Sequence, residues 1–186
     1  MSEFPVGIPV ELLDRFEAGN RWLSNPCFLE TGTHAGWTID RVLNRLFYHK
    51  ILSVELSDLH YGRAAKRFAQ YQNVHLYHGS SRQLMGRMVA DLTGPALIWL
   101  DAHYSAGDTA SDGPGLECPV REELAAIKAS GQTYHTIAID DMRDFLGGVY
   151  PTQDELRELL LGINPRYKIT VLQLRHGVML AEPSES

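Results

Sequence analysis

The chain has 186 residues, 44% of them hydrophobic and 22% charged, which is typical of one soluble globular domain and excludes a disordered chain. No apolar run approaches the roughly 20 residues of a membrane helix, and 23 acidic against 17 basic residues argue against a general nucleic-acid binder. Two cysteines are too few for a disulfide framework, and the N-terminus has no signal-peptide pattern. We therefore expect a cytoplasmic protein with no membrane and no nucleic-acid partner.

Strand-like and helix-like patterns alternate along the chain after an N-terminal arm or helix over residues 1–25. The predicted order is strand 27–31, helix 37–48, strand 51–55, helix 58–71, strand 74–78, helix 80–92, strand 95–101, helix 120–130, strand 136–140 and a helix ending near residue 163. The runs 168–174 and 178–182 flank His176-Gly177 and predict a hairpin. This alternation predicts a single domain, a doubly wound, mostly parallel Rossmann-like α/β sheet with a C-terminal antiparallel hairpin.

Several local features carry more specific predictions. Asp58 is expected to cap its helix, and Thr152 with Glu155 forms a capping box for the last one. Trp37 and Trp99 are expected to pack in the core.

The segment 104–119 has no periodicity and is expected to be a long loop over the site, with a surface loop as the alternative. In the first case Tyr104 would form an aromatic wall, and acidic residues would add negative charge beside the site. Those acidic residues are Asp108, Asp112 and Glu117.

Polar residues stand where the predicted parallel strands end. They are Glu30-Thr31-Gly32, Glu55, Gly79-Ser80-Ser81, Asp101-Ala102-His103 and Asp140-Asp141. Because ligands of open α/β sheets bind beyond the carboxyl ends of the strands, these residues mark the candidate site.

The turn after the first strand favours a particular kind of ligand. Gly32 allows a sharp turn and Gly36 allows close packing, but His34 replaces the middle glycine of a dinucleotide fingerprint. Glu30 would repel phosphates, yet it could accept a hydrogen bond from an ammonium group. Glu55 could accept both hydroxyls of a ribose. The implied ligand has a ribose and a positive charge but no phosphate.

The run ETGTHAGWT over residues 30–38 resembles the first motif of class I S-adenosylmethionine-dependent methyltransferases, closest to the catechol and caffeoyl-CoA O-methyltransferase group. Glu55, the turn Gly79-Ser80-Ser81, Asp101 and the pair Asp140-Asp141 resemble that group's later motifs. The three aspartates are also similar to those of macrocin-type O-methyltransferases. The resemblance covers residues 26–182, through five short stretches.

The resemblance implies S-adenosyl-L-methionine as the cofactor. Glu30 would face its ammonium group, Glu55 its ribose, and Ser81 with Arg82 its adenine. The full set of cofactor-binding residues that it implies is Glu30, Gly32, Thr33, Gly36, Thr38, Glu55, Ser81, Arg82 and Asp101.

The resemblance also implies that Asp101, Asp140 and Asp141 bind Mg²⁺ or another divalent cation, for which carboxylate oxygens are suitable ligands. A metal there would hold and acidify the acceptor hydroxyl. The alternative is that Asp140 and Asp141 only cap the following turn, while Asp101 orients the methionine part of the cofactor. Both interpretations stay open at this point.

The catechol-type enzymes carry a lysine as general base shortly after the fourth-strand aspartate, and this chain has none there. His103 could replace it, with Asp101 as the second catalytic residue, since the pKa of histidine lies near neutral pH. His103 could equally be a metal ligand or pack against adenine; a zinc site with Cys118 is a weaker alternative. Arg143 could meet an anionic substrate, but a salt bridge to Asp144 or Glu117 is the favoured expectation.

The leading hypothesis is an S-adenosylmethionine-dependent O-methyltransferase acting on a small hydroxylated acceptor. The alternatives are a metal-dependent hydrolase, because Asp-Ala-His also occurs there, and a non-catalytic nucleoside-binding protein. A homodimer also stays open, through apolar residues of the Phe4–Pro9 arm. Neither the acceptor nor its reacting atom follows from these motifs.

Overall fold

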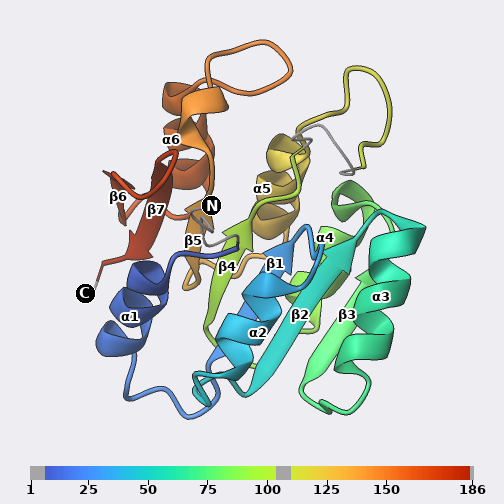
Figure 1. Cartoon of the computed structure of the whole chain (residues 1–186). Coiled ribbons are helices and arrows are strands. Elements are labelled where there is room, and N and C mark those ends of the chain that lie inside the picture. Colours follow the sequence, from blue (N-terminus) through green and yellow to red (C-terminus); the bar gives the residue numbers. More distant parts are fainter. Residues whose placement is uncertain (1–6, 104–109, 185–186) are drawn as a thin grey trace.

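The computed structural model describes residues 7–103 and 110–184, and its centre is one seven-stranded sheet (Figure 1). The strand order is β3-β2-β1-β4-β5-β7-β6. The strands are β1 (Cys27–Thr31), β2 (Lys50–Glu55), β3 (Val74–His78), β4 (Ala96–Leu100), β5 (Thr136–Ile139), β6 (Tyr167–Leu172) and β7 (Val178–Pro183). β1 to β5 are parallel, whereas β7 is antiparallel to both β5 and β6. The predicted fold class is therefore confirmed.

Helices cover both faces of the sheet. They are α1 (Val10–Gly19), α2 (Trp37–Leu43), α3 (Asp58–Phe68), α4 (Ser81–Ala90), α5 (Val120–Ala129) and α6 (Gln153–Ile163), with a short 3-10 helix η1 (Met142–Asp144) after β5. In Figure 1, α1 and α2 lie on the near face of the sheet and α4 and α5 lie behind it. In the described part of the chain, no helix is long and apolar enough to cross a membrane.

Two hydrophobic cores form because neighbouring residues of a strand point to opposite faces. Phe28 of β1 belongs to the core shared with α1, α2 and α3, while the next residue, Leu29, belongs to the core shared with α4, α5 and α6. Leu97 and Ile98 divide in the same way on β4. All five residues of β4 are buried, as its apolar sequence predicts.

Some predicted boundaries and caps differ from the structure. α2 ends at Leu43, five residues early, because Leu46 has a positive φ of 53° and Tyr48 turns back to stack on Phe16. Ser57, and not Asp58, is the N-cap of α3, since it has the extended backbone of a cap and accepts the backbone N–H of His60. The Thr152 cap of α6 is confirmed, because its hydroxyl accepts the Glu155 N–H.

The N-terminal arm packs within its own chain where it is described. Ile8 is fully buried in the core with Leu12 and Leu13, and its N–H donates to Thr38 Oγ1 at 3.1 Å. The sequence left open that apolar residues of this arm are exposed to a partner, but Ile8 is buried in the chain's own core. The rest of the predicted arm surface, Phe4–Val6, lies outside the described residues, and so do Tyr104 and Asp108.

Candidate functional site

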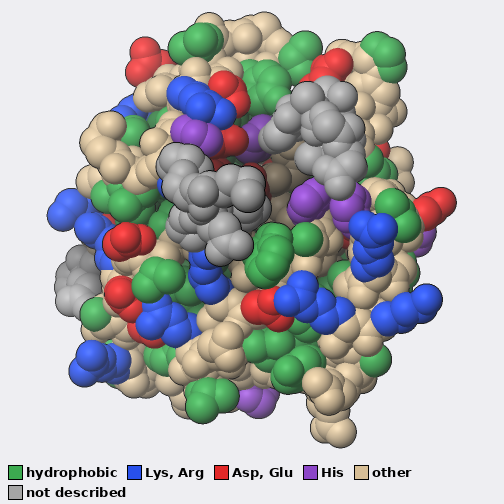
Figure 2. All heavy atoms as spheres, viewed as in Figure 1, with side chains coloured by type: hydrophobic (Ala, Val, Ile, Leu, Met, Phe, Trp, Pro, Cys, Tyr) green, Lys and Arg blue, Asp and Glu red, His purple; other side chains and the backbone are tan. Residues whose placement is uncertain are grey.

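A cavity of about 560 Å³ opens at the carboxyl edge of the parallel strands, within the volume range of small-molecule sites. Its walls come from the turns after β1, β2, β3, β4 and β5, from the β6–β7 turn, and from residues 110–119. Figure 2 shows histidine and acidic side chains around the hollowed upper part of this face. Five described carboxylates line it: Glu55, Asp101, Asp112, Asp140 and Asp141.

Most of the predicted site residues line this cavity. They are Gly32, Thr33, Thr38, Glu55, Ser81, Asp101, His103, Asp140 and Asp141. Three others, Glu30, Gly36 and Arg82, are not among the lining residues.

The turn after β1 depends on the absence of a side chain at Gly32. Its φ is +87°, and a Cβ there would lie 2.8 Å from the carbonyl oxygen of Asp101. Glycine thus lets the β1 and β4 turns approach each other closely. Thr33 and His34 continue this wall, and the His34 ring lies 4.4 Å from that of His60.

Glu55 ends β2 with both carboxylate oxygens held by backbone. Oε2 accepts the His34 N–H and Oε1 accepts the Ser57 N–H, each at 2.7 Å. Each oxygen keeps a second lone pair, so the carboxylate can still accept two hydroxyls from the cavity. The side chain is also aimed before any ligand arrives.

Glu30 acts behind the cavity wall. It is 1% exposed, and Oε1 accepts the Ser53 hydroxyl at 2.7 Å. The Ser53 and Thr33 hydroxyls are 2.5 Å apart, which connects Glu30 to a lining residue. Burial raises the pKa of Glu30 to about 8. In this structure Glu30 therefore reaches the cavity through Ser53 and Thr33.

Gly36 and Arg82 build the frame of the site. Gly36 has a φ of +79°, and a Cβ there would lie 2.6 Å from the Phe68 ring, so glycine lets α2 begin against α3. The Arg82 guanidinium donates to the carbonyls of Leu116 and Cys118 and pairs with Asp112. Arg82 thereby ties the 110–119 segment to α4.

His103 lies in a chain of polar contacts across the β4 and β5 turns. Its Nε2 is 3.0 Å from Asp141 Oδ2, and its Nδ1 is 4.0 Å from Asp101 Oδ1. Asp141 Oδ1 is 2.8 Å from His176 Nδ1. The hydrogen bond from His103 lowers the pKa of Asp141 to about 2. Burial opposes a charge on His103, but the hydrogen bond to Asp141 and the charge of Asp101 raise its pKa.

Asp101 and Asp140 form a second pair of acids. Burial and the charge of Asp140 raise the pKa of Asp101, and burial raises the pKa of Asp140. Asp140 Oδ1 is buried without a hydrogen-bond partner. A buried, unpartnered carboxylate oxygen is costly unless a ligand completes it, so the pair is suited to a positively charged group.

The predicted metal-binding trio is only partly assembled. Among the described residues, the group whose potential ligand atoms all lie within 4.8 Å of one another is His103, Asp141 and Asp144. Asp101, Asp140 and Asp141 do not form such a group, and the two oxygens of Asp141 are instead in contact with His103 and His176. The three aspartates thus fit a metal poorly as they stand, whereas one imidazole and two carboxylates are a plausible donor set for a divalent ion.

Several cavity residues were not expected from the sequence. Trp37 was expected in the core but is 51% exposed and lines the cavity, since it begins α2 on the solvent side; Trp99 is fully buried, as predicted. His60, Arg175 and His176 also line it. Glu123, at 1% exposed, lies under His103, and burial raises its pKa to about 7. Glu123 lies in the first turn of α5, His60 in α3, and Arg175 and His176 in the β6–β7 turn. None of them follows a parallel strand, so the strand-end pattern did not point to them.

Two smaller predictions concern residues near the site. Arg143 pairs with Asp144, with 3.6 Å between Nε and Oδ1, as expected. Cys118, the weaker candidate for a zinc ligand, is buried. It does not belong to the group of potential ligands formed by His103, Asp141 and Asp144.

No protein-family model matches the sequence, and no curated protein matches it in sequence. Solved structures match it in fold. A Staphylococcus aureus protein assigned to the caffeoyl-CoA O-methyltransferases aligns over 95% of this chain and 85% of its own, with a TM-score of 0.61 and 13% identity. The S-adenosylhomocysteine-bound methyltransferase PaMTH1 of Podospora anserina aligns over 96% and 80%, with a TM-score of 0.58 and 16% identity.

The N-methyltransferase NodS of Bradyrhizobium japonicum is similar too, over 94% of this chain and 95% of its own, with a TM-score of 0.54 and 12% identity. At such low identities the likeness is one of fold. The chain therefore has the fold of S-adenosylmethionine-dependent methyltransferases, and the resemblance seen in the sequence motifs is confirmed at that level.

Proposed function

We propose that this protein is an S-adenosylmethionine-dependent methyltransferase that methylates a hydroxyl group of a small molecule. The observation that carries the proposal is the cavity itself. In a methyltransferase fold, it brings Gly32, Glu55 and Ser81 together with Asp101 and His103 at the strand ends where such folds bind ligands.

The residues present are suited to this cofactor. S-adenosylmethionine carries a sulfonium and an ammonium group, and five carboxylates line the cavity. Glu55 keeps lone pairs for the ribose hydroxyls, and Gly32 lines the cavity with backbone alone. When bound, the cofactor supplies an electrophilic methyl group on sulfur.

His103 is the proposed general base. Because Asp141 is ionised, Nε2 carries the proton that is donated to Asp141, and Nδ1 keeps a free lone pair. Nδ1 can then take the proton of an acceptor hydroxyl that lies in the cavity. Asp141 is a positioning residue in this scheme, and His176 holds its second oxygen.

A metal-assisted variant is a second candidate, supported by the cluster of His103, Asp141 and Asp144. In that variant His103, Asp141 and Asp144 would hold a divalent cation. The cation would polarise the acceptor hydroxyl, so that a separate base contributes less.

The test is calorimetric titration of chelator-treated protein with S-adenosylhomocysteine, followed by methyl-transfer assays against a panel of hydroxylated compounds. Micromolar binding and transfer without added metal would support the His103 scheme. Transfer only with Mg²⁺ or Mn²⁺ would favour the metal-assisted one. Binding without transfer would favour a nucleoside-binding protein, and no binding by folded protein would overturn the proposal.

A further inference from the structure

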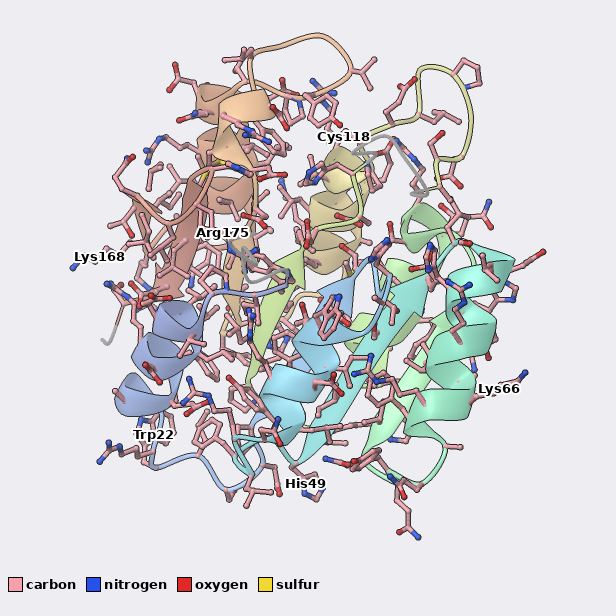
Figure 3. All side chains as sticks on the ribbon, viewed as in Figure 1. Trp22, His49, Lys66, Cys118, Lys168 and Arg175 are labelled. Atoms are coloured by element: carbon pink, nitrogen blue, oxygen red, sulfur yellow. The ribbon has the colours of Figure 1, made fainter. Side chains whose placement is uncertain are left out.

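The β6–β7 turn brings a guanidinium to the cavity. Arg175 is the one Lys or Arg among the described residues that line it, and five carboxylates line the rest. It is solvent-exposed, and its charge acts on the nearby Asp140, where it opposes the rise in pKa that burial causes. Figure 3 shows Arg175 directed inward, above the carboxyl edge of the sheet, whereas Lys168 of the same hairpin points outward.

The turn that carries Arg175 is held in place by the β5 side of the site. The carbonyl of Gly177 accepts the Met142 N–H at 3.0 Å, and the carbonyl of His176 accepts the Arg143 N–H at 3.1 Å. The His176 ring contacts Asp141. The guanidinium is therefore presented from a firmly attached turn, next to the proposed His103–Asp141 pair.

The backbone of Arg175 is in an unfavourable conformation for a residue with a side chain. Its φ is +50°, in the left-handed region that glycine adopts without cost. Glycine would suit the turn better, so its geometry does not explain an arginine there. The guanidinium itself is the feature that needs an explanation.

From this placement we infer that the methyl acceptor carries an anionic group, a carboxylate or a phosphate, which Arg175 binds. The inference rests on the proposed function. Guanidinium pairs with such groups in a bidentate fashion. The acceptor must lie beside His103, on the β5 and β7 side of β4, and Arg175 stands on that side. The predicted cofactor residues Gly32, Glu55 and Ser81 follow β1, β2 and β3, on the other side of β4.

Three variants test this inference. Arg175→Gly removes the guanidinium and also relieves the positive φ, so the variant should fold at least as well as the parent chain. Arg175→Lys keeps the charge but loses the bidentate geometry. Lys168→Ala removes an outward-pointing charge from the same hairpin and is the matched control.

The probe is inorganic phosphate, titrated calorimetrically into each protein with and without saturating S-adenosylhomocysteine. We expect Arg175→Gly to weaken phosphate binding at least tenfold, Arg175→Lys to weaken it less, and Lys168→Ala to leave it unchanged. Equal phosphate affinity in Arg175→Gly and the parent chain would overturn the inference, and so would an absence of phosphate binding to the parent chain.

A second comparison separates the acceptor from the cofactor's own carboxylate. S-adenosylhomocysteine has that carboxylate and 5′-methylthioadenosine lacks it. The inference predicts that Arg175→Gly binds both as the parent chain does. A tenfold loss for S-adenosylhomocysteine alone would assign Arg175 to the cofactor and overturn the inference. If neither nucleoside binds the parent chain, the proposed function fails, while the phosphate titration of the ligand-free protein still reports on the anion site.

Discussion

Single side chains of this site owe their orientation to partners that lie far away in the sequence. Glu55 is held by the N–H groups of His34 and Ser57, and His103 by Asp141, 38 residues further on. Such support orients a group before a ligand binds, which lowers the cost of binding and of reaching the transition state. Two predictions follow from these residues.

Glu55→Gln should weaken S-adenosylhomocysteine binding by about tenfold or more. The amide has one acceptor oxygen in place of two, so one of the N–H groups or one of the ribose hydroxyls loses its partner. Calorimetry measures the affinity, with Glu158→Gln on the exposed side of α6 as the control. Unchanged affinity would exclude Glu55 from the nucleoside site.

His103→Gln should lower the rate of methyl transfer by about 10²- to 10⁴-fold, the usual contribution of a general base. The affinity for S-adenosylhomocysteine should change less than about twofold. Single-turnover assays with an acceptor found in the screen measure the rate, and His49→Gln on an exposed histidine is the control. A rate near that of the parent chain would remove His103 from the mechanism.

Two separate constraints require glycine at turns around the site. One is a backbone with a positive φ, and the other is a neighbouring atom that leaves no room for a Cβ. Gly36 has both, with φ +79° and the Phe68 ring 2.6 Å from a Cβ. Gly131, after α5, has φ +71° and nothing within 4 Å of a Cβ. The pair therefore separates the cost of the backbone conformation from the cost of the contact between α2 and α3.

Gly131→Ala should lower the free energy of unfolding by about 1 kcal/mol, the cost of a left-handed alanine. Gly36→Ala should lower it by about 2–4 kcal/mol, because the Phe68 ring must also move. Urea denaturation at constant m-value gives both numbers. If both variants lose the same free energy of unfolding, the contact between Gly36 and the Phe68 ring adds no cost, and the prediction for Gly36→Ala is wrong.

At the scale of the whole molecule, the two edges of the sheet have different tasks. The cavity lies at the carboxyl edge. At the amino edge lies a buried histidine, His135, whose hydrogen bonds connect the first residues of β4 and β6. His135 Nδ1 accepts the N–H of Ala96 at 3.1 Å, and the carbonyl of His135 accepts the hydroxyl of Tyr167 at 2.8 Å. Burial lowers the pKa of His135 to about 4.

This histidine predicts a loss of stability in mild acid. Below about pH 6.5 the unfolded chain takes up a proton at His135, while the folded chain does so only near pH 4. The contribution to the free energy of unfolding is therefore present at pH 7 and falls by roughly 3 kcal/mol as the pH drops to 4.

His135→Gln should remove this dependence. Urea denaturation at pH 7 and pH 4.5 should show the difference between variant and parent chain shrink or reverse at the lower pH. Buried Glu30 and Glu123, whose pKa values burial raises, contribute in the opposite direction, so only the comparison with the variant isolates His135. The His49→Gln control should follow the parent chain, and a constant difference between His135→Gln and the parent chain would contradict the prediction.

The layered α/β fold, and the edge of the sheet at which the site lies, could be predicted from the sequence alone. Both follow from local patterns, because apolar periodicity separates strands from helices and parallel strands bring their carboxyl ends together. Gly32, Glu55, Asp101 and His103 could be expected at the cavity for this reason, and all four line it.

The orientation and partners of the side chains at that edge could not be predicted from the sequence and are seen only in the three-dimensional structure. Asp141 faces two histidines and Arg175 lines the cavity, and both residues have a positive φ, 53° and 50°. Glu30 is withdrawn behind Ser53, and Trp37 is exposed at the start of α2. Side-chain direction at a turn depends on backbone angles and on packing against elements distant in the chain, which local sequence patterns do not contain.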